Sequence, residues 1–177
     1  MKAMKMLLGA LLALMVLGGI GMAQTTTQVN ADVAKYLKLT VPGEINGWHL
    51  TVGPNTQPGS GLSVDTNAAW EIDAKSALDL PELSNNYYGT FWSQTAYTAN
   101  IGAMAGTPAA GPGFLANVLH LDAGTDFPLS DNNHVLRTGT SVGLTPVSFA
   151  MNQQVVSSDP AENDYRIVIE FTASNII

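Results

Sequence analysis

The sequence predicts an all-β protein, a β-sandwich of about eight to ten short, mostly antiparallel strands in an Ig-like or jelly-roll-like layout. Short runs that alternate apolar and polar residues recur along the chain, and clusters of Gly, Pro, Asn and Asp separate them. No segment of useful length after residue 23 carries the helical period of apolar residues. The alternation favours strands, and the missing helical period argues against α/β folds.

The first 23 residues have the layout of a secretory signal peptide. Lys2 and Lys5 give a positive start, and residues 7–20 form an uncharged apolar run. Small residues at 21–23 (GMA) stand at the spacing of a cleavage site. The run is too short and wrongly flanked to span a membrane. We therefore expect cleavage before Gln24, secretion to the extracellular cell surface, and no membrane span after processing.

Two parts are expected after cleavage: a leader at residues 24–32 (QTTTQVNAD) and a sandwich domain at 33–177. The leader contains no proline, and an extended chain would place Val29, Ala31 and Val33 on one face. Because its threonines tolerate extended geometry, the leader is a candidate donor strand for a neighbouring subunit. A disordered tail is the alternative, as is usual for chain ends.

The first four strands are expected over Val33–Val41, Trp48–Val52, Leu62–Val64 and Trp70–Asp73. Turn residues separate them at Pro42-Gly43 and Asn67, and residues 53–61 (GPNTQPGSG) have the composition of a loop. Residues 75–83 suit one helical turn before Pro81, which is too short to anchor a helix layer. Residues 84–113 give no continuous pattern.

The last third predicts further strands over residues 114–121, 134–137, 147–155 and 165–172. An acidic turn at Asp159–Asp164 precedes the final strand, which alternates most clearly. In that strand Ile167, Ile169 and Phe171 share one face, and we expect them to be buried together with Trp48 and Trp70.

Four of these runs stand in a recognisable order: 45–50 (INGWHL), 62–70 (LSVDTNAAW), 149–154 (FAMNQQ) and 165–172 (YRIVIEFT). Over about residues 33–174 the chain resembles exported archaeal cell-surface β-sandwich proteins of the methanogen type, WxL-like in layout. It distantly resembles archaeal bundling pilins and TasA-type fibre proteins, and that resemblance implies assembly by strand exchange. The single Trp-x-Leu run is Trp48-His49-Leu50, far from the C-terminus, so the cell-wall binding of true WxL domains does not carry over.

Composition narrows the partners and the chemistry. The chain has no cysteine, which excludes disulfides, thiol chemistry and thiolate metal sites. Beyond the predicted signal peptide there are 14 acidic and five basic residues, a net charge of −9. Such a surface repels phosphate backbones, so we expect no nucleic-acid partner.

One run resembles a catalytic motif. Residues 139–143 (GTSVG) match the Gly-x-Ser-x-Gly nucleophile elbow around Ser141, which needs a following helix and a downstream histidine. Pro146 forbids the helix, and all three histidines (His49, His120, His134) precede Ser141. We interpret the run as a Gly-rich turn.

Acidic residues and histidines are the candidates for a glycosidase pair or a metal site. Glu71 and Asp73 share one face of a strand, and Glu82, Glu162 and Glu170 stand in no recognisable context for a glycosidase pair. The stretch Asp122–Asn133 offers oxygen ligands for calcium from Asp122, Asp126, Asp131, Asn132 and Asn133, with ordinary turns as the alternative. His120 and His134 would suit a metal together with Asp122, or lie on the surface. The sequence thus assigns no catalytic, cofactor or metal residue.

Aromatic residues are the remaining candidates, because aromatic faces suit apolar sugar faces. They are Trp48, Trp70, Trp92, Tyr87, Tyr88 and Phe91. Trp48 and Trp70 fall on the inward phase of their strands, whereas the run Tyr87–Trp92 remains a candidate binding surface.

These observations favour a non-enzymatic extracellular structural subunit whose partner is itself, assembled into a filament, pilus or sheath. The alternative is a monomeric surface or adhesion domain that binds carbohydrate or another envelope protein through Tyr87–Trp92.

Overall fold

The computed structural model describes residues 31–77, 88–96 and 113–176. The chain divides into two compact units, Met1–Val33 and Ala34–Ile177. Of the first unit, residues 31–33 are described; they are exposed and belong to no strand. The predicted signal peptide, residues 24–30 of the leader and most of the unassigned stretch 84–113 lie outside the described residues.

The second unit is all-β, as the alternation predicted. Its strands are β1 (Leu37–Thr40), β2 (Gly53–Gly59), β3 (Ser63–Thr66), β4 (Trp70–Ala77), β5 (Trp92–Ser93), β6 (His120–Asp122), β7 (Asp126–Pro128), β8 (His134–Gly139), β9 (Gly143–Pro146), β10 (Phe149–Val155), β11 (Tyr165–Arg166) and β12 (Val168–Asn175). All the paired strands are antiparallel.

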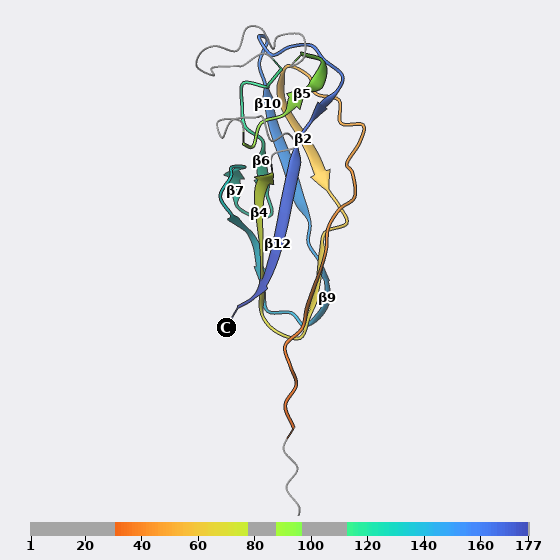
Figure 1. The fold of residues 1–177 in the computed structure, drawn as a ribbon, viewed down its shortest axis with the longest axis vertical. Helices are drawn as coiled ribbons and strands as arrows, with labels where there is room; N and C mark the ends of the chain where they lie inside the picture. The colour runs from red at the N-terminus through yellow and green to blue at the C-terminus, as the bar shows by residue number, and fades with distance from the viewer. Residues whose placement is uncertain (1–30, 78–87, 97–112, 177) are drawn as a thin grey trace, which may run out of the picture. The chain divides into compact units, whose positions relative to one another are not determined.

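The strands form the two layers of a sandwich (Figure 1). One layer is the sheet β12-β4-β8, prolonged by the short sheet β11-β5, since only Ile167 separates β11 from β12. The other layer joins the sheets β2-β10-β6-β7 and β1-β3-β9, which a bond from the Val147 N–H to the Leu62 carbonyl (2.9 Å) links. In Figure 1 β12 crosses in front of β10, and between them the rings of Phe171 and Phe149 meet with centroids 5.6 Å apart.

Backbone hydrogen bonds join the two layers where the chain passes from β7 to β8, and we call this the closed side. The Leu129 N–H donates to the Leu119 carbonyl before β6 (2.8 Å). The carbonyl of the next residue, Ser130, accepts from the Ser76 N–H in β4 (2.7 Å). This segment is therefore bonded to both layers at once.

The core lies between the layers and uses alternate residues of the central strands. Val64 of β3, Ile72 of β4 and Leu121 of β6 are each 0% exposed. Trp70 is buried, as predicted. The predicted register of the last strand is confirmed, because Ile169 and Phe171 pack against the core while Val168, Glu170 and Thr172 are exposed. The expected burial is not reached, because Ile167, Ile169 and Phe171 are half-buried at the edge of the sheet.

The largest departure from the sequence prediction is β2, because residues 53–59 were expected to be a loop. They pair with β10 over seven residues, from Gly53 opposite Val155 to Gly59 opposite Phe149. As β2 is the edge of its sheet, one side of its backbone needs no ladder partner, and an edge tolerates Pro54 and Pro58. The Phe149 ring lies where a Cβ at Gly59 would stand, so the glycine makes room for a core side chain.

The opposite error occurs just before β2. A second strand was expected around Trp48–Val52, but residues 41–52 form no strand. Trp48, which was expected to be buried, is half-buried, and so is Leu50. His49 is exposed, as predicted, whereas Val52, which was expected on the same face as Trp48, is 69% exposed. The alternation therefore predicted the packing of two side chains but not the absence of a ladder.

Several boundaries also differ. β1 is shorter than the predicted strand over Val33–Val41, and β4 continues through Ala77, where a helical turn was expected. In the predicted strand at 114–121, Phe114 makes an isolated bridge to Trp92 and residues 120 and 121 enter β6. β7 and β9 were not predicted, since they are only three and four residues long.

Candidate functional site

The serine of the Gly-x-Ser-x-Gly run lies between two strands. Ser141 is exposed in the connection from β8 to β9, so a strand rather than a helix follows it. The run begins at Gly139, which lies opposite Trp70 in the ladder and leaves space for the indole ring. The strand-to-helix geometry that exposes a nucleophile is therefore not built around Ser141.

The carboxylates that were candidates for a glycosidase pair lie apart from one another in the fold. Glu170 of β12 lies 3.3 Å from the Lys75 ammonium, and the two residues are register partners on β12 and β4. Glu71 and Asp73 lie half-buried on the face of β4 away from the core. Glu162 lies half-buried in the acidic turn, and Glu82 falls outside the described residues.

The oxygen-rich stretch is divided among separate contacts. Asp122 accepts from the Gly124 N–H (2.8 Å) within the β6–β7 turn, and Asp131 accepts from the Asn132 amide (3.0 Å). His134 contacts Ser130 (3.1 Å) and stacks on the Phe127 ring, with centroids 5.1 Å apart. Among the residues that the structure describes, no three acidic or histidine side chains gather as a metal site requires.

The candidate aromatic surface turns inward where the structure describes it. Phe91 and Trp92 are 8% and 3% exposed, so neither offers a ring face to a sugar. Arg166 lies over the Trp92 ring, 4.1 Å from its centroid, and Trp48 meets Phe91 edge-on at 5.8 Å. Tyr88 is half-buried, and Tyr87 lies outside the described residues. The expectation of a stacking surface at Tyr87–Trp92 is therefore wrong for Phe91 and Trp92.

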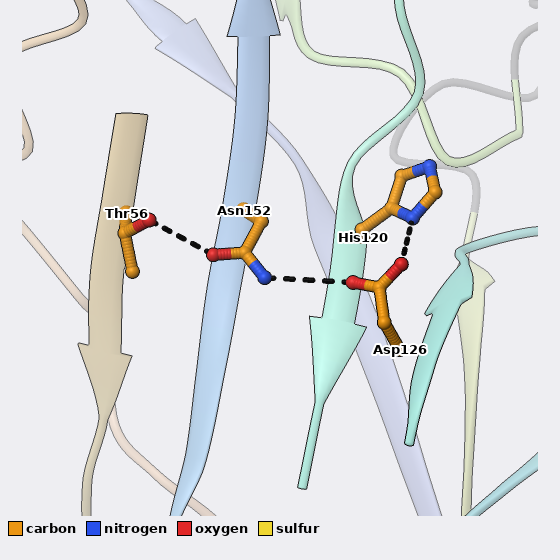
Figure 2. Close-up of polar contacts among 4 residues, drawn as sticks. All are labelled: Thr56, His120, Asp126 and Asn152. Atoms are coloured by element: carbon orange, nitrogen blue, oxygen red, sulfur yellow. Dashed lines mark hydrogen bonds and ion pairs between the residues drawn. The ribbon is translucent and has the colours of Figure 1, made fainter. Parts of the chain in front are cut away.

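A row of polar side chains crosses the outer face of the sheet β2-β10-β6-β7 (Figure 2). The Thr56 hydroxyl donates to the side-chain oxygen of Asn152 (2.9 Å), and the side-chain NH2 of Asn152 donates to Asp126 (3.5 Å). The other Asp126 oxygen lies 2.7 Å from His120 Nδ1. Each residue comes from a different strand, so only the register of four strands reveals the row. Its members bond to one another across the sheet, which stabilises the pairing of the strands.

The chain just before β1 is held by side chains from the end of β3 and from the β3–β4 turn, an arrangement we call the clamp. The Asn67 side chain accepts from the Tyr36 N–H and donates to the Ala34 carbonyl, both at 2.9 Å. Thr66 donates to the Tyr36 carbonyl (2.7 Å). The Tyr36 hydroxyl donates to Asp65 (2.7 Å), and this bond raises the pKa of the phenol above its usual 10.0. The clamp fixes the chain immediately after the leader.

The side of the sandwich opposite the closed side, which we call the open side, has a different character. It is bordered by β1, residues 41–52 and the β11–β12 segment. In the described part of the chain, the apolar side chains that pack against the core while only partly buried come from these three segments: Leu37, Leu39, Trp48, Leu50, Tyr165, Ile167, Ile169, Phe171 and Ala173. β1 approaches β12 from the other layer, but no ladder joins them. Among the described residues the open side is thus packed by side chains without a strand across it.

The sequence predicts part of the open side. The inward phase of the final strand predicted which of its residues face the core. That they remain half-buried depends on β12 being an edge strand, which no local pattern encodes.

Comparison with known protein families, curated proteins and solved structures gave no match. In the described part of the chain, no helix has both the length and the apolar character that a membrane span requires.

Proposed function

We propose that this chain is an extracellular structural subunit that self-assembles into a cell-surface filament, pilus or sheath. Export is supported by the charge, apolar run and small residues of positions 1–23. Assembly is supported by a strand-capable leader ahead of a sandwich. A head-to-tail contact between such subunits propagates into an open filament.

The open side is the observation that carries this proposal. Half-buried apolar side chains line it, whereas those of the central strands are fully buried. Burying apolar surface contributes roughly 25 cal/mol per Å², so covering these side chains would favour association. Unpaired strand edges add main-chain hydrogen bonds to that gain.

The alternative, a monomeric domain that binds glycan or another envelope protein, loses its main candidate surface. Phe91 and Trp92 are buried and make contacts within the domain. The polar row across β2, β10, β6 and β7 remains as an exposed feature, and its members are engaged with one another.

The test starts from the secreted protein. Its intact mass should correspond to a chain that begins at Gln24, and negative-stain images of the purified protein should show polymers. Deletion of residues 24–32 should leave the domain folded, because the clamp and the core lie beyond them, and should abolish long polymers. A secreted wild-type chain that stays monomeric at all concentrations, with or without the leader, would contradict the proposal.

A further inference from the structure

We propose that the outer edge of β12 is the acceptor in this assembly and that residues 25–33 of a neighbouring copy add to it as a strand. The inference rests on the proposed function and names the contact through which the subunits join. It follows from three features: the exposed edges of the domain, the half-buried face beside one of them, and the chain that precedes the clamp.

The other exposed edges carry features that discourage strand addition. Prolines occur in three of these strands: Pro54 and Pro58 in β2, Pro128 at the end of the three-residue β7, and Pro146 at the end of β9. β8 pairs with β4 through a register shift at Ile72/Asp73, and β1 is only four residues long. Prolines lack a donor, short edges offer few bonds, and irregular ladders bend away from a flat partner.

β12 differs from all of these edges. Its eight residues (VIEFTASN) contain neither proline nor glycine, and they pair with β4 in unbroken register from Val168 to Asn175. Its one charged side chain, Glu170, is matched by Lys75 on β4. As β12 is the last strand of its sheet, alternate backbone N–H and C=O groups face away from β4. β12 is thus the longest regular edge without proline in the described residues.

The inward face of β12 also carries apolar side chains that an added strand could cover. Ile169, Phe171 and Ala173 face the core but stay half-buried. β1 approaches β12 from the other layer, yet among the described residues no ladder pairs with the outer edge of β12. Residues 25–33 alternate so that Val29, Ala31 and Val33 share one face when extended. An added strand would place that apolar face beside the half-buried row and its polar face outward. Nine residues also match the eight of β12 in length.

A neighbouring copy fits better than the same chain. The clamp fixes Ala34 and Tyr36, and β1 runs on from there into the domain. To reach its own β12, the leader would have to reverse direction ahead of the clamp. Of the residues typical of turns, residues 24–36 contain Asn30 and Asp32 but no glycine or proline, and neither forms the Asn-Gly or Asp-Gly pair that favours a tight reversal. An extended leader that enters another subunit needs no reversal.

Disulfide trapping tests the contact, because the chain has no cysteine of its own. One chain carries Gln28→Cys or Asn30→Cys, which covers both orientations of the added strand, and a second chain carries Thr172→Cys. Mixed and oxidised, the two full-length secreted chains should form a disulfide-linked dimer on a non-reducing gel. The matched control replaces Thr172→Cys with Thr138→Cys, an exposed threonine on β8, the other edge of the same sheet. That pair should stay unlinked.

A charge variant tests the same edge without crosslinking. Thr172→Lys places an edge lysine opposite Asp73, and Thr138→Lys places one opposite Glu71. Each new ammonium therefore faces a β4 carboxylate, so both variants should keep the wild-type melting temperature. Thr172→Lys should lose sedimentable polymer, and Thr138→Lys should assemble as wild type.

The outcomes separate the two proposals. Polymers that form normally with Thr172→Lys, or that trap the leader cysteine at Thr138→Cys and not at Thr172→Cys, would overturn the β12 acceptor while the structural role stands. Wild-type chains that neither polymerise nor crosslink would overturn both. Specific trapping at Thr172→Cys together with loss of polymer in Thr172→Lys supports both.

Discussion

Single polar side chains fix turns that lie far apart in the sequence. Asp164, just before β11, accepts from the hydroxyl of Ser93, the last residue of β5, and from the Thr95 N–H and hydroxyl, both at 2.9 Å. The bond from Ser93, with those from Thr95, holds the pKa of the Asp164 carboxyl below its ordinary 3.8. One ionised carboxylate thereby ties the acidic turn to residues 93–95.

A pH dependence follows for Asp164. A carboxyl group whose pKa is lowered by folding stabilises the native state fully above its unfolded value of about 3.8, and this contribution is lost as the pH falls through the folded value. Asp164→Asn should therefore lower the free energy of unfolding by about 1 kcal/mol near pH 7, a modest figure because the group is partly solvated. Urea unfolding of both proteins at pH 7 and pH 3 measures this. The difference between them should shrink at pH 3; an equal difference at both pH values would show that the carboxylate charge plays no part.

Glycines in strands show why residue type alone misleads. Gly59 and Gly139 stand opposite Phe149 and Trp70, and a Cβ at either position would overlap the partner's ring. Both glycines lie in sequence stretches that read as turns, yet each belongs to a ladder. The aromatic ring that fills the glycine's space comes from a strand far away in the sequence, so a local reading cannot find it.

At the scale of elements, the strands that the sequence predicts correctly are those whose own residues alternate between the core and the outer face. β12 and β4 alternate because each has one face on the core, and this pattern is written in their own residues. β2 has no such pattern: its pairing is imposed by β10, and the Asn55 side chain, which donates to the Thr51 carbonyl (2.7 Å), holds its start. The inward turn of Phe91 and Trp92 likewise depends on the β5–β11 pairing, which joins residues more than 70 positions apart.

Because β12 is an edge strand, its inward side chains are only half-buried and should contribute less to the free energy of unfolding than fully buried ones. Phe171 contacts Phe149 across the core but stays half-buried, so Phe171→Ala should destabilise the domain by about 2 kcal/mol rather than the ~3–5 typical of a fully buried ring. Urea unfolding under conditions where the protein is monomeric measures this. The exposed neighbour Thr172, changed to Ala, provides the control and should change stability by less than about 0.5 kcal/mol. A loss at Phe171→Ala as large as that of Leu121→Ala, whose side chain is fully buried, would show that the open side is better covered than its exposure indicates.

For the whole molecule, the two sides of the sandwich differ: the closed side is joined by backbone hydrogen bonds, and the open side is the proposed site of association. The closed side joins the layers through backbone bonds at Ser130 and Leu129, whereas the open side joins them through side-chain packing. The open side leaves a regular edge and a half-buried apolar row beside it. A soluble monomer would usually protect such an edge with lysine, proline or a bulge. Here proline, short length or a register shift occurs on the other edges, so the proposed polymer would grow at β12.

The net charge of the chain should make the proposed assembly depend on salt concentration. The chain beyond residue 23 carries a net charge of −9, so the subunits of the proposed polymer would repel one another at low ionic strength. One of the carboxylates, Asp32, lies in the leader and would stand at the proposed contact. The attraction proposed for β12 comes from main-chain bonds and apolar burial, which salt does not weaken. Screening with a Debye length of about 10 Å at 0.1 M salt would therefore favour assembly.

The expected outcome is a critical concentration for polymerisation that falls as salt rises from about 0.02 M to about 0.5 M. Sedimentation of the secreted protein at a series of concentrations measures it in each buffer. Asp32→Asn serves as the comparison: with less repulsion at the contact, its critical concentration should lie below that of wild type at low salt and converge with it at high salt. If added salt instead dissolved the polymers, ion pairs rather than strand addition would hold the subunits together, and the edge of β12 would not be the contact that carries the assembly.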